Sequence, residues 1–177
     1  MSNKVFITLM VITVIVLGIG LVVTLLPEKE NNNTEKTTGE TVNTSKESNI
    51  EGTLEEIMTK VYAGIPEDKL PMMLMNMELT SEDIEYYVGT ADIDFKEALV
   101  SESGVGSIAH SVVLVRLNNA RNAEDAVTKI KENADPRKWI CVEASNVVVK
   151  SKGDLVILIM SNEDLAPKLD ANFEGLE

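Results

Sequence analysis

The chain has 177 residues, a single Cys, a single His and a formal net charge of −13. The acidic excess argues against nucleic-acid binding and against docking onto anionic lipid, because both require a basic face. A lone cysteine excludes an internal disulfide.

The first segment of the chain predicts a membrane anchor. Val5–Leu26 contains no charged residue and consists mostly of Val, Ile and Leu. At about 1.5 Å of rise per residue, a helix of this length crosses a hydrocarbon core of roughly 30 Å. Pro27 ends the helix, so residues 1–27 are the predicted anchor. A signal peptide cleaved after Gly20 is the alternative, but the apolar run continues beyond that residue.

The charges that flank the anchor bear on its orientation. Lys4 and the free amino terminus favour a cytoplasmic N-terminus, whereas Lys29 and Lys36 nearly balance the charge rule. The segment before the helix is very short, and a long polar region follows it. We therefore expect a single-pass protein of the cell membrane with a cytoplasmic N-terminus and an extracytoplasmic C-terminal domain.

The next segment predicts a disordered linker over residues 28–50. Its composition is Asn, Thr, Glu, Lys and Ser with few apolar residues. Such a sequence cannot bury enough apolar surface to offset chain entropy. Residues 51–177 have the length of one domain.

The domain opens with two predicted helices. Thr53-Leu54-Glu55-Glu56 forms a capping box, and apolar residues at helical spacing follow until Gly64 and Pro66. A short helix with an apolar face of Ile84, Tyr87 and Val88 ends at Gly89. The intervening Leu70–Met77 segment is too short and irregular to assign.

Two hairpins predict four strands. Residues 93–100 and 108–117 flank a turn with two glycines. Residues 147–149 and 155–160 are apolar runs, rich in Val and Ile, on either side of a polar turn containing Gly153.

Three further helical segments complete the domain. Ala123–Asn133 has an apolar stripe, Asp135-Pro136 predicts one helical turn anchored by Trp139, and Leu165, Leu169 and Phe173 have helical spacing. The predicted class is therefore α+β, with an antiparallel four-stranded sheet and helices mainly on one face.

Three stretches together resemble a known family. They are Leu70-Pro71-Met72, the segment from Ser107 to Arg116, and the segment from Asp135 to Val142. They are similar to an uncharacterised domain-of-unknown-function family of small, membrane- or lipid-anchored envelope proteins of Gram-positive bacteria. The resemblance implies an anchored α+β domain and assigns no catalytic residue. The chain lacks the cysteine that lipid-anchored members carry after the apolar segment.

A methionine cluster is the strongest candidate for metal chemistry. Met73, Met75 and Met77 would share one face of an extended segment, and thioethers suit Cu(I). The alternative is that these residues fill the core. Loss of Cu(I) binding in a Met73→Leu/Met75→Leu variant would distinguish the two.

The remaining candidates form no recognisable catalytic motif. His110 is expected to be buried and neutral, with pH sensing as the alternative, and Cys141 beside Trp139 is expected to be a buried thiol. The basic residues nearest the predicted sheet ends either form salt bridges or bind a carboxylate-bearing ligand such as a wall peptide; they are Arg116, Arg121, Arg137 and Lys138.

These patterns predict where the protein acts more than which chemistry it performs. We expect a membrane-anchored extracytoplasmic binding module without catalytic residues or cofactors, whose partner is an envelope protein or a wall component. The alternatives are an envelope hydrolase or Cu(I)-handling protein, and a structural subunit of a membrane assembly. The oligomeric state is not indicated.

Overall fold

The computed structural model describes residues 49–177, so the predicted anchor over residues 1–27 and nearly all of the predicted linker lie outside the described residues. Within residues 49–177, none of the helices combines the length and apolarity that a membrane span requires. The described part of the chain is an α+β domain.

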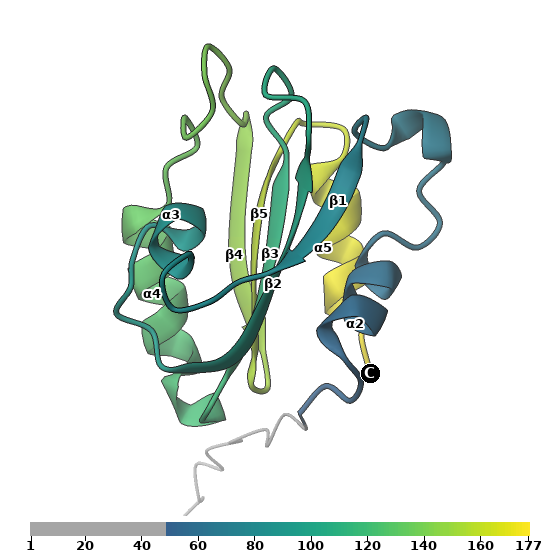
Figure 1. Cartoon of the computed structure of the whole chain (residues 1–177). Coiled ribbons are helices and arrows are strands. Elements are labelled where there is room, and N and C mark those ends of the chain that lie inside the picture. The colour runs from purple at the N-terminus through teal and green to yellow at the C-terminus, as the bar shows by residue number, and fades with distance from the viewer. Residues whose placement is uncertain (1–48) are drawn as a thin grey trace, which may run out of the picture. The chain divides into compact units, whose positions relative to one another are not determined.

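Five antiparallel strands form the sheet, in the order β1-β2-β3-β5-β4 (Figure 1). The strands are β1 (Leu74–Glu78), β2 (Phe95–Ser103), β3 (Ser111–Leu117), β4 (Asn146–Lys152) and β5 (Leu155–Ser161). The predicted α+β class and both predicted hairpins are confirmed, but the count of four strands is wrong because β1 was not recognised. β1 is an edge strand with four exposed residues and one half-buried residue, so it lacks the apolar alternation that marks a strand in sequence.

Helices cover both faces of the sheet, not mainly one face as predicted. On one face lie α2 (Leu54–Val61) and α5 (Ala166–Glu174), and on the other lie α3 (Ile84–Val88) and α4 (Ala123–Asn133) (Figure 1). Short 3-10 helices, η1 (Glu67–Lys69) and η2 (Ala120–Asn122), lie in the connections.

The two central strands explain this arrangement. Every residue of β3 and β5 is buried, and both strands are nearly continuous runs of Val, Ile and Leu. Leu114 and Ile157 pack with α2 and α5, whereas Val113 and Leu158 pack with α3 and α4. A strand without a polar face must be covered on both sides, so one layer of helices is not sufficient.

The helix boundaries follow local rules in most places. The predicted capping box is present: the Thr53 hydroxyl accepts from the Glu56 N–H at 3.2 Å, and the Glu56 carboxylate accepts from the Thr53 N–H at 3.0 Å. Pro167 lies in the first turn of α5, where its missing N–H costs nothing. The segment after Asp135 forms one turn and no helix: the Lys138 N–H donates to the Asp135 carbonyl oxygen at 3.2 Å. The Asp135 carboxylate accepts from the Arg137 N–H at 2.9 Å, as expected of a capping residue.

A glycine lets α3 lie close to α4. Gly89 caps α3 with φ of +85°, a backbone conformation that favours glycine. A Cβ at this position would lie 2.1 Å from the Asn133 carbonyl oxygen at the end of α4. The position therefore requires glycine both for its backbone conformation and for the close approach of the two helices.

We predict that Gly89→Ala destabilises the domain by at least about 2 kcal/mol, since it adds a backbone clash to left-handed strain. Gly64→Ala is the matched control, because Gly64 also has a positive φ, +71°, but nothing lies within 4 Å of its Cβ position. This control should lose only about 1 kcal/mol. Urea unfolding followed by circular dichroism measures both values. Equal losses in the two variants would contradict the close packing of α3 on α4.

Candidate functional site

The two faces of β1 border two different surfaces. Met75 lies opposite Glu102 and Met77 opposite Val100, and Val100 belongs to the core under α3 and α4. Leu74 and Asn76 lie opposite Ser103 and Ser101 and therefore face the α2 side. Residues of β1 thus contribute alternately to each surface.

Lys138 lies at the centre of the surface on the α3 side, with a side chain that is only 5% exposed. Its ammonium group is 4.4 Å from the centroid of the Tyr87 ring, 5.0 Å from that of Trp139 and 5.3 Å from that of Tyr86. It also pairs with the Glu102 carboxylate at 2.9 Å. Three aromatic rings and one carboxylate therefore hold a nearly buried cation.

Hydrogen bonds tie this group to the sheet. The Trp139 indole N–H donates to Glu102 at 3.1 Å, and Lys138 donates to the Ser111 hydroxyl at 3.2 Å. Burial lowers the pKa of Lys138, and its hydrogen bond with Glu102 opposes that shift. Burial also raises the pKa of Tyr87, with the Glu102 charge acting in the same direction. The cluster fastens the segment after α4 to strands β2 and β3.

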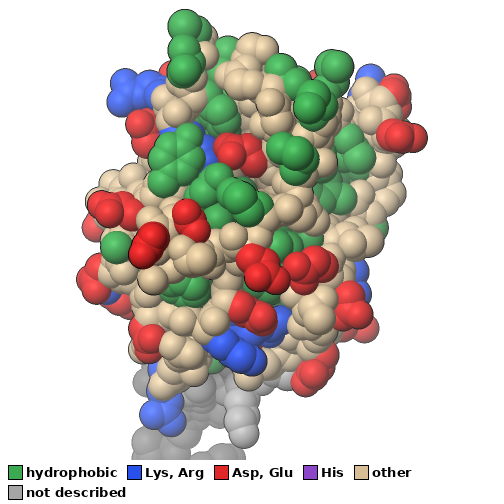
Figure 2. Space-filling model, in the orientation of Figure 1, with side chains coloured by type: hydrophobic (Ala, Val, Ile, Leu, Met, Phe, Trp, Pro, Cys, Tyr) green, Lys and Arg blue, Asp and Glu red, His purple; other side chains and the backbone are tan. Residues whose placement is uncertain are grey.

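Large apolar side chains surround this cluster and are exposed to solvent. We call them the Met–aromatic surface, which comprises Met73, Met75, Met77, Tyr86, Trp139 and Ile140. The exposed fractions are 65% for Met73, 58% for Met75, 48% for Met77, 60% for Tyr86 and 84% for Ile140, whereas Trp139 is half-buried. Figure 2 shows hydrophobic side chains gathered over the upper part of this face and acidic side chains over its lower part.

The methionines are therefore not core residues, which corrects the expectation that they fill the interior. Met75 and Met77 face the same side of β1, and Met73 precedes the strand in a left-handed conformation with φ of +53°. Their thioethers are accessible to a ligand. No cluster of three or more His, Cys, Asp or Glu side chains in residues 49–177 could hold a metal ion, and Cu(I) binding by the methionines stays a prediction.

Cys141 is exposed, so the prediction of a buried thiol is wrong. It has φ of +66° and follows the exposed Ile140 in a segment without helix or strand. The apolar neighbours that suggested burial divide between two environments, because Trp139 turns toward Glu102 while Ile140 points to solvent. Arg137 is exposed as well and lies 3.6 Å from Asp135.

His110 is buried and joined to two hydroxyl groups, in agreement with the expected buried state. Its Nε2 lies 2.7 Å from the Tyr62 hydroxyl, and its Nδ1 lies 2.8 Å from the Ser161 hydroxyl. Burial, with a smaller contribution from Lys138, lowers its pKa to about 4. With both ring nitrogens engaged, His110 has no free nitrogen to activate Cys141, so the geometry does not support a Cys–His nucleophile.

Arg116 is buried, and its contacts hold parts of the domain together. Its guanidinium donates to Glu97 at 2.7 Å and to the carbonyl oxygens of Ile50 and Gly52 at 2.8 Å each, and it lies 3.5 Å from Asp154. These four partners leave the guanidinium no free edge for a carboxylate ligand. The side chain instead fastens the start of the domain to β3.

Sequence reasoning missed the group of contacts around Lys138 and, with Tyr86, part of the Met–aromatic surface. Lys138 was expected only as a basic residue near a sheet end and Tyr87 only as an apolar position of a short helix. Tyr86 and Glu102 were not singled out. The contacts among them join α3, β2 and the segment after α4, which are distant in sequence. One signal was available: Tyr86 and Tyr87 are adjacent in a short helix, so they cannot both face the core.

Comparison of the chain with models of known protein families, with curated proteins and with solved structures finds no match in any of the three.

We predict that His110 makes the domain less stable as the pH falls from 6.5 toward about 4. Below pH 6.5 the unfolded chain binds a proton that the folded chain does not bind, so the free energy of unfolding falls with pH. This group alone contributes a slope of at most about 1.4 kcal/mol per pH unit.

The measurement is urea unfolding at several pH values for the wild type and for His110→Gln. Carboxylates titrate in both proteins, so the difference between the two curves isolates His110. Tyr62→Phe is the control, because it removes one hydrogen bond and leaves the imidazole in place, and it should keep the slope. Parallel curves for the wild type and His110→Gln would contradict the prediction.

Proposed function

We propose that this protein is a membrane-anchored, extracytoplasmic module that binds another protein through the Met–aromatic surface. The observation that supports the proposal is the exposure of Met75, Met77, Tyr86 and Ile140 around a rigid, nearly buried Lys138. Large apolar side chains that gather, exposed, on one face of a domain mark interaction sites.

The composition of the surface favours a protein partner. Methionine and aromatic side chains are enriched in the cores of protein–protein interfaces, and methionine adapts its shape to the facing surface. The Lys138–Glu102 pair lies among these side chains and supplies a fixed polar centre. A rigid centre with adaptable apolar surroundings suits a convex or extended partner better than a small molecule, which needs an enclosing pocket.

The anchor and the linker complete the proposal. Val5–Leu26 would hold the domain at the membrane, and residues 28–50 would allow it to reach partners in the envelope. Tethering raises the effective concentration of such partners, so a modest intrinsic affinity suffices. The resemblance to anchored envelope proteins of Gram-positive bacteria agrees with this arrangement.

Fewer observations support the alternative functions. A hydrolase would need a nucleophile and a base, and the engaged imidazole of His110 supplies no base. Cu(I) handling is favoured only by the exposure of the methionine thioethers. A structural subunit of a membrane assembly would use the same Met–aromatic surface, but its function would also depend on the identity of the Val5–Leu26 helix.

We predict that a photo-crosslinking amino acid at Tyr86 or at Ile140, in the full-length protein in intact cells, captures the same partner protein. The two positions lie in separate elements of one surface, so a genuine interface reaches both. Mass spectrometry of the crosslinked species identifies the partner.

Glu163 is the control position, because it is exposed and precedes α5 on the other face of the sheet. A Met75→Glu/Met77→Glu background should reduce the yield at Tyr86 severalfold, since it places charges in the apolar surface. Equal capture from Glu163, or no recurrent species from either test position, would refute the proposed interface.

We also predict that a membrane-impermeant maleimide labels the wild-type protein in intact cells. The exposed Cys141 serves as the reporter, so no new cysteine is needed. Cys141→Ala is the control for background, and a Thr38→Cys change in that variant reports on the linker. Labelling only after lysis would place the domain in the cytoplasm and contradict the extracytoplasmic proposal.

A further inference from the structure

The outer edge of β1 has unpaired main-chain groups. Leu79 donates its N–H to the Ala98 carbonyl, and Met73 accepts from the Gly104 N–H, which fixes the residues of β1 that point toward β2. In an antiparallel pair, residues whose main-chain groups point toward the partner strand alternate with residues whose main-chain groups point away from it. The N–H and C=O groups of Leu74, Asn76 and Glu78 therefore point away from β2, and within residues 49–177 no other strand pairs with them.

Two hollows lie along this edge, between β1 and α2, and we refer to them together as the groove. Its wider part has a volume of about 570 Å³ and is bordered by Met58, Tyr62 and Ala63 on one side and by Leu70 and Leu74 on the other. The second part, of about 220 Å³, is lined by Glu55 and Glu78 together with Leu54 and Leu99. The first part is mainly apolar and the second is charged.

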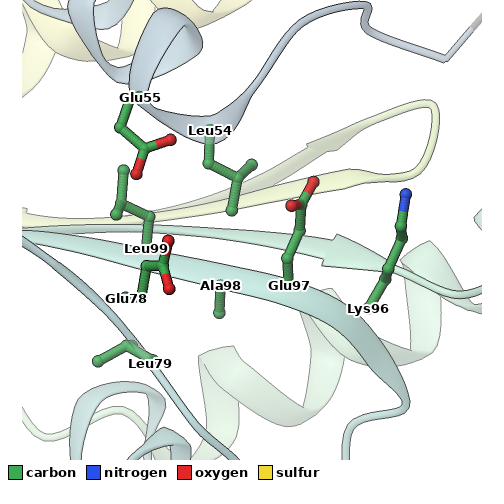
Figure 3. Close-up of a pocket in the computed structure, with 8 residues that line it drawn as sticks. All are labelled: Leu54, Glu55, Glu78, Leu79, Lys96, Glu97, Ala98 and Leu99. Atoms are coloured by element: carbon green, nitrogen blue, oxygen red, sulfur yellow. The ribbon is translucent and has the colours of Figure 1, made fainter.

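The charged part carries more acids than bases. Figure 3 shows the Glu55 side chain from α2 and the Glu78 side chain from β1 on either side of Leu99 in the lining of this part. Neither carboxylate has an ion-pair partner among the described residues. Glu97 is neutralised by Arg116, and Lys96 is the only base in this part of the groove. The groove thus offers two free carboxylates to a cation.

The two parts are separated by a defined distance along the strand. Leu74 and Glu78 lie four residues apart and on the same face, or about 13 Å in an extended chain. A strand that pairs antiparallel with β1 passes Glu78 before Leu74. A basic side chain near Glu78 would therefore precede an apolar side chain near Leu74 by four residues.

We propose that this groove binds an extended segment of a partner protein, which adds to the sheet as a sixth, antiparallel strand beside β1. The segment carries Lys or Arg followed four residues later by a large apolar residue. Main-chain hydrogen bonds to Leu74, Asn76 and Glu78 supply the register, and the side chains supply the specificity. This site lies on the α2 side of β1 and is independent of the Met–aromatic surface.

The negative charge of the domain favours a basic segment of a partner protein over a second copy of the chain as the occupant of the groove. Residues 50–177 contain 24 Asp and Glu against 12 Lys and Arg, which gives a formal charge of about −12. Two such domains joined edge to edge would repel each other, and pairing centred on Asn76 would place Glu78 opposite the apolar Leu74. A basic segment avoids both the repulsion between acidic domains and the placement of a carboxylate opposite an apolar residue.

The test uses a fluorescent, capped ten-residue peptide of Thr and Val with Arg and Leu four residues apart, and the full-length protein in detergent micelles. Fluorescence anisotropy should show binding that weakens with salt. Glu55→Lys/Glu78→Lys should weaken it by at least about tenfold, since repulsion replaces attraction. A peptide with Glu in place of Arg should then bind this variant better than it binds the wild type.

The backbone contribution is tested separately. Asn76→Pro should abolish binding, because the N–H that it removes points outward and not into the β1–β2 ladder. Asn76→Thr keeps this N–H and should bind normally. Hydrogen exchange read by NMR should slow at the amides of Leu74, Asn76 and Glu78 when peptide is added, while those of Met75 and Met77 stay unchanged.

Three results would overturn the proposal. The first is equal binding of a peptide whose alternate amides are N-methylated, which cannot pair with β1. The second is protection of the outward amides without peptide in a protein that sediments as a dimer, which would assign the edge to a second copy. The third is that the wild-type protein, shown by its NMR spectrum to be folded, does not bind the peptide at low salt.

Discussion

The structure depends on the burial of both faces of β3 and β5. Each of these strands is buried along its whole length, and together they hold the two apolar cores apart. Helices must occupy both faces of the sheet centre, so the centre has no surface left for a ligand. Contacts with other molecules are confined to the edges of the sheet and to the segments that join its elements. Both proposed binding surfaces adjoin β1 for this reason.

The group around Lys138 shows how an irregular segment acquires a fixed shape. Residues 134–145 form no helix or strand, yet Trp139 and Lys138 both bond to Glu102 on β2. A cation that is nearly buried requires such partners, because desolvation of an unpaired charge is costly. The ring contacts add a favourable electrostatic contribution. The contacts of Lys138 and Trp139 hold the backbone beside the exposed Ile140, and the contact of Lys138 with the Tyr86 ring ties α3 to the same group.

The sequence predicted the elements whose signals are local. The capping box at Thr53, the stripe of α4 and the turn between β4 and β5 all depend on neighbouring residues, and each was found in place. β1 escaped prediction because an edge strand exposed to solvent has no apolar period. Helices were expected mainly on one face, although the uninterrupted apolar runs of β3 and β5 already required cover on both.

The candidate site residues also divide into those whose environment follows from nearby sequence and those whose environment depends on distant segments. The buried state of His110 follows from its place in an apolar stretch, and so it was expected. The exposure of Cys141 and the burial of Arg116 depend on contacts between segments that are distant in sequence, such as Arg116 with Ile50. Composition near a residue says little about such contacts. The orientation of β1, which sends Met75 to one side and Asn76 to the other, needs the pairing register as well as the period.

The bonds from Arg116 to the carbonyl oxygens of Ile50 and Gly52 have a mechanical consequence. A pulling force applied at residue 49 would reach the guanidinium before it reached α2, and through it the middle of the sheet. Strand β3 is held there by β2 on one side and β5 on the other, so the load would act on several ladders of hydrogen bonds at once. The first helix would therefore be protected from unravelling when the domain is pulled from its N-terminal side.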